Sequence, residues 1–244
     1  MGLFNLLSPV FGAIDGLFAT VLPASLRLAL WAAGLAVATM LLYKILSPQA
    51  RIGEAKREAR EARRTLNRFD GEFADAGPLI KNQFVTAFRH IGLVVPGTFI
   101  AILPLLCFLV WADNQFGHTL PAPGDPAPAV RTVPESGSDM QTTWQAANGA
   151  DRPAQLDVRY GSQAQHYAMT APVNIVAKSS AWNWLVGNPL GYLPADAPVE
   201  AVTIELPTRE FIHFGPAWMR GWFSIFIPVM FIISLGMFRW AKIE

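Results

Sequence analysis

The stretch QARIGEAKREAREARRTLNRFDGEFADAGPLIKNQFVTAFRHI, residues 49–91, decides the fold, because it is a long charged segment between two apolar runs. Its apolar residues recur at alternating steps of three and four, which is the a/d spacing of a coiled coil. This seam comprises Ile52, Ala55, Ala59, Ala62, Leu66, Phe69 and Phe73. The seam could close a helical hairpin, dimerise the protein or pair with a partner's helix.

Two dipeptides offer a turn inside this segment, Asp70-Gly71 and Gly77-Pro78. We expect the reversal at Asp70-Gly71, because it gives arms of comparable length, 49–69 and 73–91. The chain would then return through Phe84, Phe88 and Ile91.

Composition indicates a membrane protein. The 244 residues are 52% hydrophobic and 15% charged, whereas soluble domains average about 25% charged residues. A formal net charge of +1 gives no reason to expect specific nucleic-acid binding. Cys107 is the single cysteine and the four histidines are scattered, so we expect no disulfide, metal site or cofactor.

Three apolar runs are long enough to cross a hydrocarbon core of ~30 Å. We place transmembrane spans at 26–48, 91–111 and 216–240, the last with tryptophans at both ends. Residues 1–25 are apolar but interrupted by Pro9, Gly12, Asp15 and Gly16, and they predict an interfacial amphipathic segment.

The basic residues predict the orientation. Residues 49–91 hold nine Lys and Arg, and the C-terminal end of the sequence, which includes the tail at 241–244, adds Arg239 and Lys242. Because basic loops stay in the cytoplasm, we expect the hairpin and C-terminus to be cytoplasmic and the N-terminus to lie outside.

The segment between the second and third spans should lie outside as well. Residues 112–155 are rich in Pro and Ala and predict a linker. Residues 156–215 contain four β-like runs, at 156–161, 166–171, 173–179 and 199–207. These runs predict a small sandwich-like β-domain, which strands from the linker could complete. The aromatic segment 182–194 fits either a packed loop or a membrane-facing lip.

Two stretches carry a family resemblance: LLYKILSPQARIGEAKREAREARRTLNRFDGEF at 41–73 and the proline-bearing GTFIAILPLLCFLVW at 97–111. With the order of the parts, they resemble the core plan of the YidC/Oxa insertase superfamily. The chain is most similar to the three-span branch that contains the insertase subunit of the endoplasmic reticulum membrane protein complex and its bacterial relatives. The likeness covers residues 20–111 and 216–244. The β-domain departs from the plan, and the five-span YidC core has two more spans.

The resemblance implies a multi-pass insertase of a bacterial-type inner membrane, not an enzyme. A hydrophilic groove would pass nascent membrane proteins into lipid, with the hairpin meeting the ribosome or partner subunits. Arg27 is the only charge early in span 1 and the candidate groove arginine. The other groove candidates are Thr39, Met40, Thr98, Ser224, Met230, Ser234 and Met237.

These residues also have ordinary structural interpretations. Arg27 could reach the headgroups, hydroxyls could bond within their own helix, and methionines could fill the core. The alternative function is a structural or assembly subunit that scaffolds partners through its hairpin and β-domain.

Overall fold

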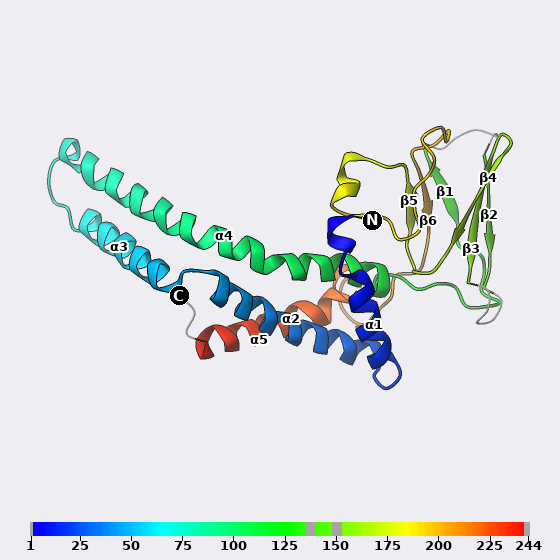
Figure 1. Ribbon diagram of the computed structural model, residues 1–244, viewed down its shortest axis with the longest axis horizontal. Helices are drawn as coiled ribbons and strands as arrows, with labels where there is room; N and C mark the ends of the chain where they lie inside the picture. Colours follow the sequence, from blue (N-terminus) through cyan, green and yellow to red (C-terminus); the bar gives the residue numbers. More distant parts are fainter. Residues whose placement is uncertain (1, 135–139, 148–152, 242–244) are drawn as a thin grey trace. The chain divides into compact units, whose positions relative to one another are not determined.

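The computed structural model describes residues 2–134, 140–147 and 153–241 (Figure 1). The chain forms two compact units. Unit 1 comprises Met1–Leu28 with Leu106–Phe226, and unit 2 comprises Ala29–Leu105 with Ile227–Glu244.

Three helices are long and apolar enough to cross a membrane: α2 (Ala24–Leu46), α4 (Gly77–Phe116) and α5 (Phe223–Trp240). The three predicted spans fall on these helices, so the prediction of three long apolar helices is confirmed. Prolines lie inside α4 and α5 without ending them. The third helix begins at Phe223, later than the predicted 216, and the 3-10 turn η4 (Ala217–Met219) precedes it.

The charged segment forms helix α3 (Gln49–Asn67), which is followed by the 3-10 turn η2 (Phe73–Ala76) and by α4. The return helix therefore begins at Gly77, and the prediction that it begins at 73 is wrong. Pro78 explains this start, because proline lacks an N–H and has a fixed φ that suits the first turn of a helix. The return arm and the second span are one continuous helix of 40 residues.

The predicted seam is buried along most of α3. Ile52, Ala55 and Ala62 are buried, and Ala59 and Leu66 are half-buried. Phe69, past the end of the helix, is exposed. The side chain of Phe73, the last predicted seam residue, lies outside the described part of the chain.

The expected return path through Phe84, Phe88 and Ile91 is wrong, because all three side chains are exposed. The half-buried residues in this part of α4 are Gln83, Thr86, Ala87 and His90. An alanine seam brings two helices close together and leaves little room for a phenyl ring, so smaller side chains fit beside it. Arg89 donates to Glu58 at 2.7 Å and connects the two arms.

Unit 1 contains two antiparallel sheets of three strands. The first has the order β1 (Val130–Val133), β6 (Ala201–Ile204), β5 (Ile175–Ala177), and the second has the order β2 (Met140–Gln145), β3 (Gln155–Tyr160), β4 (Gln163–Ala168). One hydrophobic core includes Leu156 and Val158 of β3 and Val176 and Val202 of the other sheet.

Four of the six strands overlap the predicted β-like runs, although β4 begins three residues before the predicted run at 166–171. The other two, β1 and β2, lie in the segment 112–155, so the expectation that this whole segment is a linker is wrong. Val130 pairs with Ile204 and Trp144 with Leu156. The β-domain thus depends on strands supplied by a Pro-rich stretch. This agrees with the alternative prediction, in which strands from the linker complete the domain.

The N-terminal residues form the 3-10 turn η1 (Leu3–Asn5) and helix α1 (Ser8–Ala19). Pro9 lies in the first turn of α1, where it does not interrupt the helix. Phe11 and Asp15 are the buried residues of α1. Between β5 and β6 lies the 3-10 turn η3 (Ala181–Trp184), which belongs to the aromatic segment.

Candidate functional site

A cavity of about 390 Å³ lies in unit 2 between α2, α4 and α5. Five of the eight predicted groove residues line it: Thr39, Met40, Thr98, Met230 and Ser234. The remaining lining residues are Tyr43, Ala101, Ile102, Leu105 and Phe238. The structure therefore brings together residues from three separate parts of the chain.

Helical spacing explains why these residues share one space. On α5 they recur every fourth residue, at Met230, Ser234 and Phe238, and residues four apart lie on one face of a helix. On α2 they fall within about one turn, from Thr39 to Tyr43. Sequence reasoning missed Tyr43, although its position four residues after Thr39 was an available signal.

The cavity wall is mainly apolar but carries hydroxyl groups. The Thr98 hydroxyl donates to the Val94 carbonyl at 3.0 Å, so it is satisfied within its own helix. The Thr39 hydroxyl is buried and has no hydrogen-bond partner among the described residues. A buried polar group without a partner is uncommon in proteins, so the Thr39 hydroxyl is the group of the cavity wall with an unused capacity for a hydrogen bond among the described residues.

Two contacts in unit 2 hold these helices together. At Gly97 of α4 a Cβ would overlap the Ser47 Oγ, so the chain after α2 approaches α4 closely at this glycine. The Lys44 Nζ donates to the Ala241 carbonyl at 2.8 Å and joins the last turn of α2 to the end of α5. The cavity is thus formed by three helices with fixed close contacts.

Three predicted groove residues do not line this cavity. Met237 is half-buried on α5. The Ser224 hydroxyl donates to the Gly221 carbonyl at 2.6 Å, in the turn that leads into α5. Arg27 is buried in unit 1, where its Nη1 lies 2.5 Å from the Asp15 Oδ2. Neither interpretation of Arg27, as a groove residue or as a headgroup contact, anticipated this ion pair.

The ion pair is part of a small charged cluster in unit 1. The Arg27 guanidinium lies 5.4 Å from the centre of the buried Phe116 ring, and Arg209 lies 5.9 Å from the same ring. Burial lowers the pKa of Arg209, the positive charge of Arg27 lowers it further, and Asp15 partly offsets both effects. The Asp15 carboxyl group thus pairs with Arg27 and also acts on Arg209.

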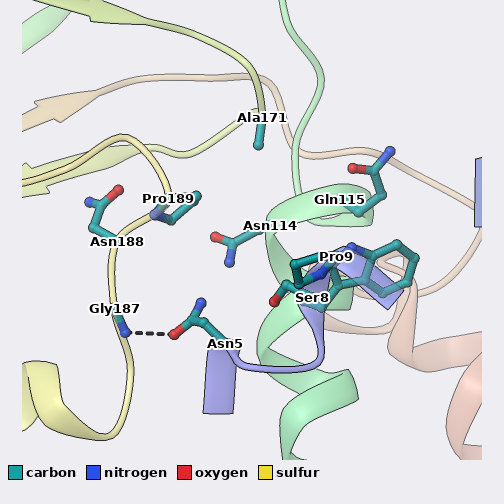
Figure 2. A pocket seen from close by; sticks show the side chains of 10 residues that line it. Asn5, Ser8, Pro9, Asn114, Gln115, Ala171, Gly187, Asn188 and Pro189 are labelled. Atoms are coloured by element: carbon teal, nitrogen blue, oxygen red, sulfur yellow. Dashed lines mark hydrogen bonds between the residues drawn. The ribbon is translucent and has the colours of Figure 1, made fainter. Parts of the chain in front are cut away.

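A second cavity, of about 270 Å³, lies in unit 1 (Figure 2). Its wall carries side-chain amides from three segments, at Asn5, Asn114, Gln115 and Asn188. The Asn5 Oδ1 accepts a bond from the Gly187 N–H at 2.6 Å and joins the N-terminal turn to the loop after η3.

Among the described residues, no group of three or more His, Cys, Asp and Glu could hold a metal ion. Comparisons with models of protein families, with curated proteins and with solved structures find no match to the chain.

Proposed function

We propose that the chain is a membrane insertase or membrane chaperone of the YidC/Oxa type, in which the cavity between α2, α4 and α5 receives part of a nascent membrane protein. One observation carries the proposal: five of the groove residues that the sequence predicts line a single cavity. In this proposal the protein lies in a bacterial-type inner membrane with its N-terminus outside and its hairpin and C-terminus in the cytoplasm.

The chemistry of the cavity suits such a role. Polar groups are costly inside hydrocarbon, and hydroxyls can offset part of that cost without placing a charge in the membrane. At about 390 Å³, the cavity is in the range of sites for small molecules, roughly 300–1,000 Å³. It has room for a few side chains rather than a whole helix, so a passing segment would be bound one part at a time.

Site-specific photocrosslinking tests the proposal. A photoreactive amino acid is placed at Ile102 or Met230, which line the cavity, and at the adjacent exposed residues Leu103 or Phe231 as matched controls. The protein is reconstituted in vesicles during translation of a single-span membrane protein with a short translocated tail. We expect crosslinks to the nascent chain from the first pair well above those from the second. Equal yields from both pairs would contradict the proposal.

Hydroxyl removal gives a second measurement. We expect Thr39→Val with Ser234→Ala to lower the inserted fraction roughly two- to tenfold, because one hydrogen bond contributes ~0.5–1.5 kcal/mol. Ser224→Ala is the matched control, since its hydroxyl bonds within its own turn. Insertion that is unchanged in the double variant would show that the cavity hydroxyls do not contact the substrate.

The alternative function, a structural or assembly subunit, is favoured by a different observation. The return arm of the hairpin exposes Phe84, Val85, Phe88 and Ile91, and a cluster of exposed apolar residues is typical of an interaction surface. If this function is correct, Phe84→Ser with Phe88→Ser abolishes co-purification of a stoichiometric partner and leaves crosslinking in the cavity at background.

A further inference from the structure

Five large apolar side chains are exposed where the aromatic segment meets the N-terminal turn. We call this set the aromatic lip; its members are Leu3, Leu6, Trp182, Trp184 and Val186. Trp182 and Trp184 are 73% and 66% exposed, whereas Trp144 of the same unit is only partly exposed and packs against the β-domain core. A group of exposed apolar side chains usually marks a contact surface.

The backbone under the lip is well fixed. The Phe4 N–H donates to the Leu185 carbonyl at 2.8 Å, and the Gly187 N–H donates to the buried Asn5 side chain at 2.6 Å. At Gly2 a Cβ would overlap the Gly187 nitrogen, so only glycine allows this approach. The two segments therefore form one support from which the apolar side chains project.

The lip lies beside the end of the apolar part of α4. A cavity of about 490 Å³ is lined by Leu109 and Val110 of α4, by Val186 of the lip and by the neighbouring Asn183. In the sequence, the uncharged run of α4 ends at Ala112, and the first charge follows at Asp113. The lip is thus at the level where a membrane-spanning α4 would leave the hydrocarbon.

The start of α5 shows the same pattern. Phe214 and Trp218 are exposed just ahead of the first residue of that helix, Phe223. Trp side chains are enriched at membrane–water interfaces because an apolar ring and a polar N–H suit a layer that is half apolar and half wet.

We propose that the aromatic lip inserts into the membrane interface at this end of the spans, with lipid headgroups and the adjoining acyl chains as its partner. Charge distinguishes this partner from others. Residues 2–14 and 181–194 contain no Lys, Arg, Asp or Glu, so the lip suits neutral lipid rather than an acidic or basic protein surface. The inference requires only that the apolar helices cross a membrane, and it does not depend on the insertase proposal.

Spin-label depth measurement tests the lip. Cys107 is the single cysteine, so Cys107→Ala gives a background in which one new cysteine can be labelled. Labels at Trp182→Cys and Trp184→Cys are compared with Ser162→Cys, an exposed position in the turn between β3 and β4. The full chain is reconstituted in phosphatidylcholine vesicles, and relaxation by oxygen, which partitions into lipid, is compared with relaxation by a water-soluble nickel chelate.

We expect the ratio of oxygen to nickel accessibility to be several-fold higher at 182 and 184 than at 162. Equal ratios would overturn the proposal, as would labels shielded from both reagents, because shielding indicates a protein partner. Quenching by brominated lipid gives an independent measurement without cysteine substitution. Trp182→Phe with Trp184→Phe should remove a large share of the quenching, whereas Trp144→Phe should remove almost none.

Discussion

The ion pair between Asp15 and Arg27 allows a quantitative prediction about the stability of unit 1. The side chains are 4% and 11% exposed, and the Arg27 Nη1 lies 2.5 Å from the Asp15 Oδ2. Asp15→Asn keeps the shape of the side chain and removes its charge. Arg27 then stays buried without an anion, and breaking a buried pair in this way costs ~3–5 kcal/mol.

The surroundings place the expected loss in the upper part of that range. Arg209 contacts the same Phe116 ring as Arg27, so Asp15→Asn leaves two cations near each other with less compensation. For a protein of this size, 1 kcal/mol corresponds to roughly 2–4 °C in Tm. At ~4–5 kcal/mol, we therefore expect Asp15→Asn to lower the Tm in detergent by roughly 8–20 °C, measured by near-UV circular dichroism.

A surface ion pair in the same unit is the matched control. Arg131 and Glu205 lie 2.7 Å apart with side chains 63% and 52% exposed. We expect Glu205→Gln to cost only ~0–1 kcal/mol, because water screens an exposed pair. Replacing the buried pair by Asp15→Leu with Arg27→Met should recover most of the loss. A Tm for Asp15→Asn equal to that of Glu205→Gln, or no recovery in the double variant, would refute the reasoning.

Two further predictions concern unit 2 and the β-domain. Gly97→Ala should destabilise the protein by ~1–3 kcal/mol, because the new methyl group would overlap Ser47. Gly92→Ala is the matched control and should not destabilise the protein, because the space around its Cβ is open. Equal Tm values for the two variants would contradict the close approach of Ser47 to Gly97. Burial raises the pKa of Tyr167, and its hydroxyl donates to the Tyr192 carbonyl at 3.1 Å. The protonated Tyr167 side chain therefore contributes fully to stability below the unfolded pKa of about 10. This contribution is lost as the pH rises through the folded pKa. Tyr167→Phe should weaken this alkaline loss in pH-dependent unfolding, and an unchanged profile would contradict it.

The three apolar helices and five cavity residues can be predicted from the sequence because both depend on local patterns. A run such as residues 91–111 indicates a helix by length and apolar content alone. Thr39, Thr98 and Ser234 are polar residues in apolar helices, so they are conspicuous without knowledge of the packing.

Contacts between distant residues are harder to predict. Asp15 and Arg27 are the isolated charges of two adjacent apolar segments, but nothing in a helical period indicates that the second helix folds back to join them. Strand β1 pairs with β6 across more than 70 residues, Val130 with Ile204, and local composition favours a linker instead.

The prediction for the hairpin's return arm is wrong for a steric reason. A coiled-coil seam normally takes large apolar residues, and that rule places Phe84 and Phe88 inside. Alanines on the opposite helix favour small neighbours, and the phenyl rings therefore face outward. The exposed residues of a helix depend on the size of the partner's side chains as well as on its own pattern.

Because the return arm and the span form one helix, α4 keeps its residues in phase over its whole length. Within unit 2, one row of residues along α4 runs in alternating steps of four and three. It begins with the exposed residues Phe84, Phe88, Ile91 and Val95 and continues with the cavity-wall residues Thr98, Ile102 and Leu105. Inserting a single residue after Ile91 would rotate the two groups by about 100° relative to each other. Insertion of seven would restore the alignment to within about 20° and lengthen the arm by ~10 Å. α4 thus fixes the angular relation between the arm and the cavity.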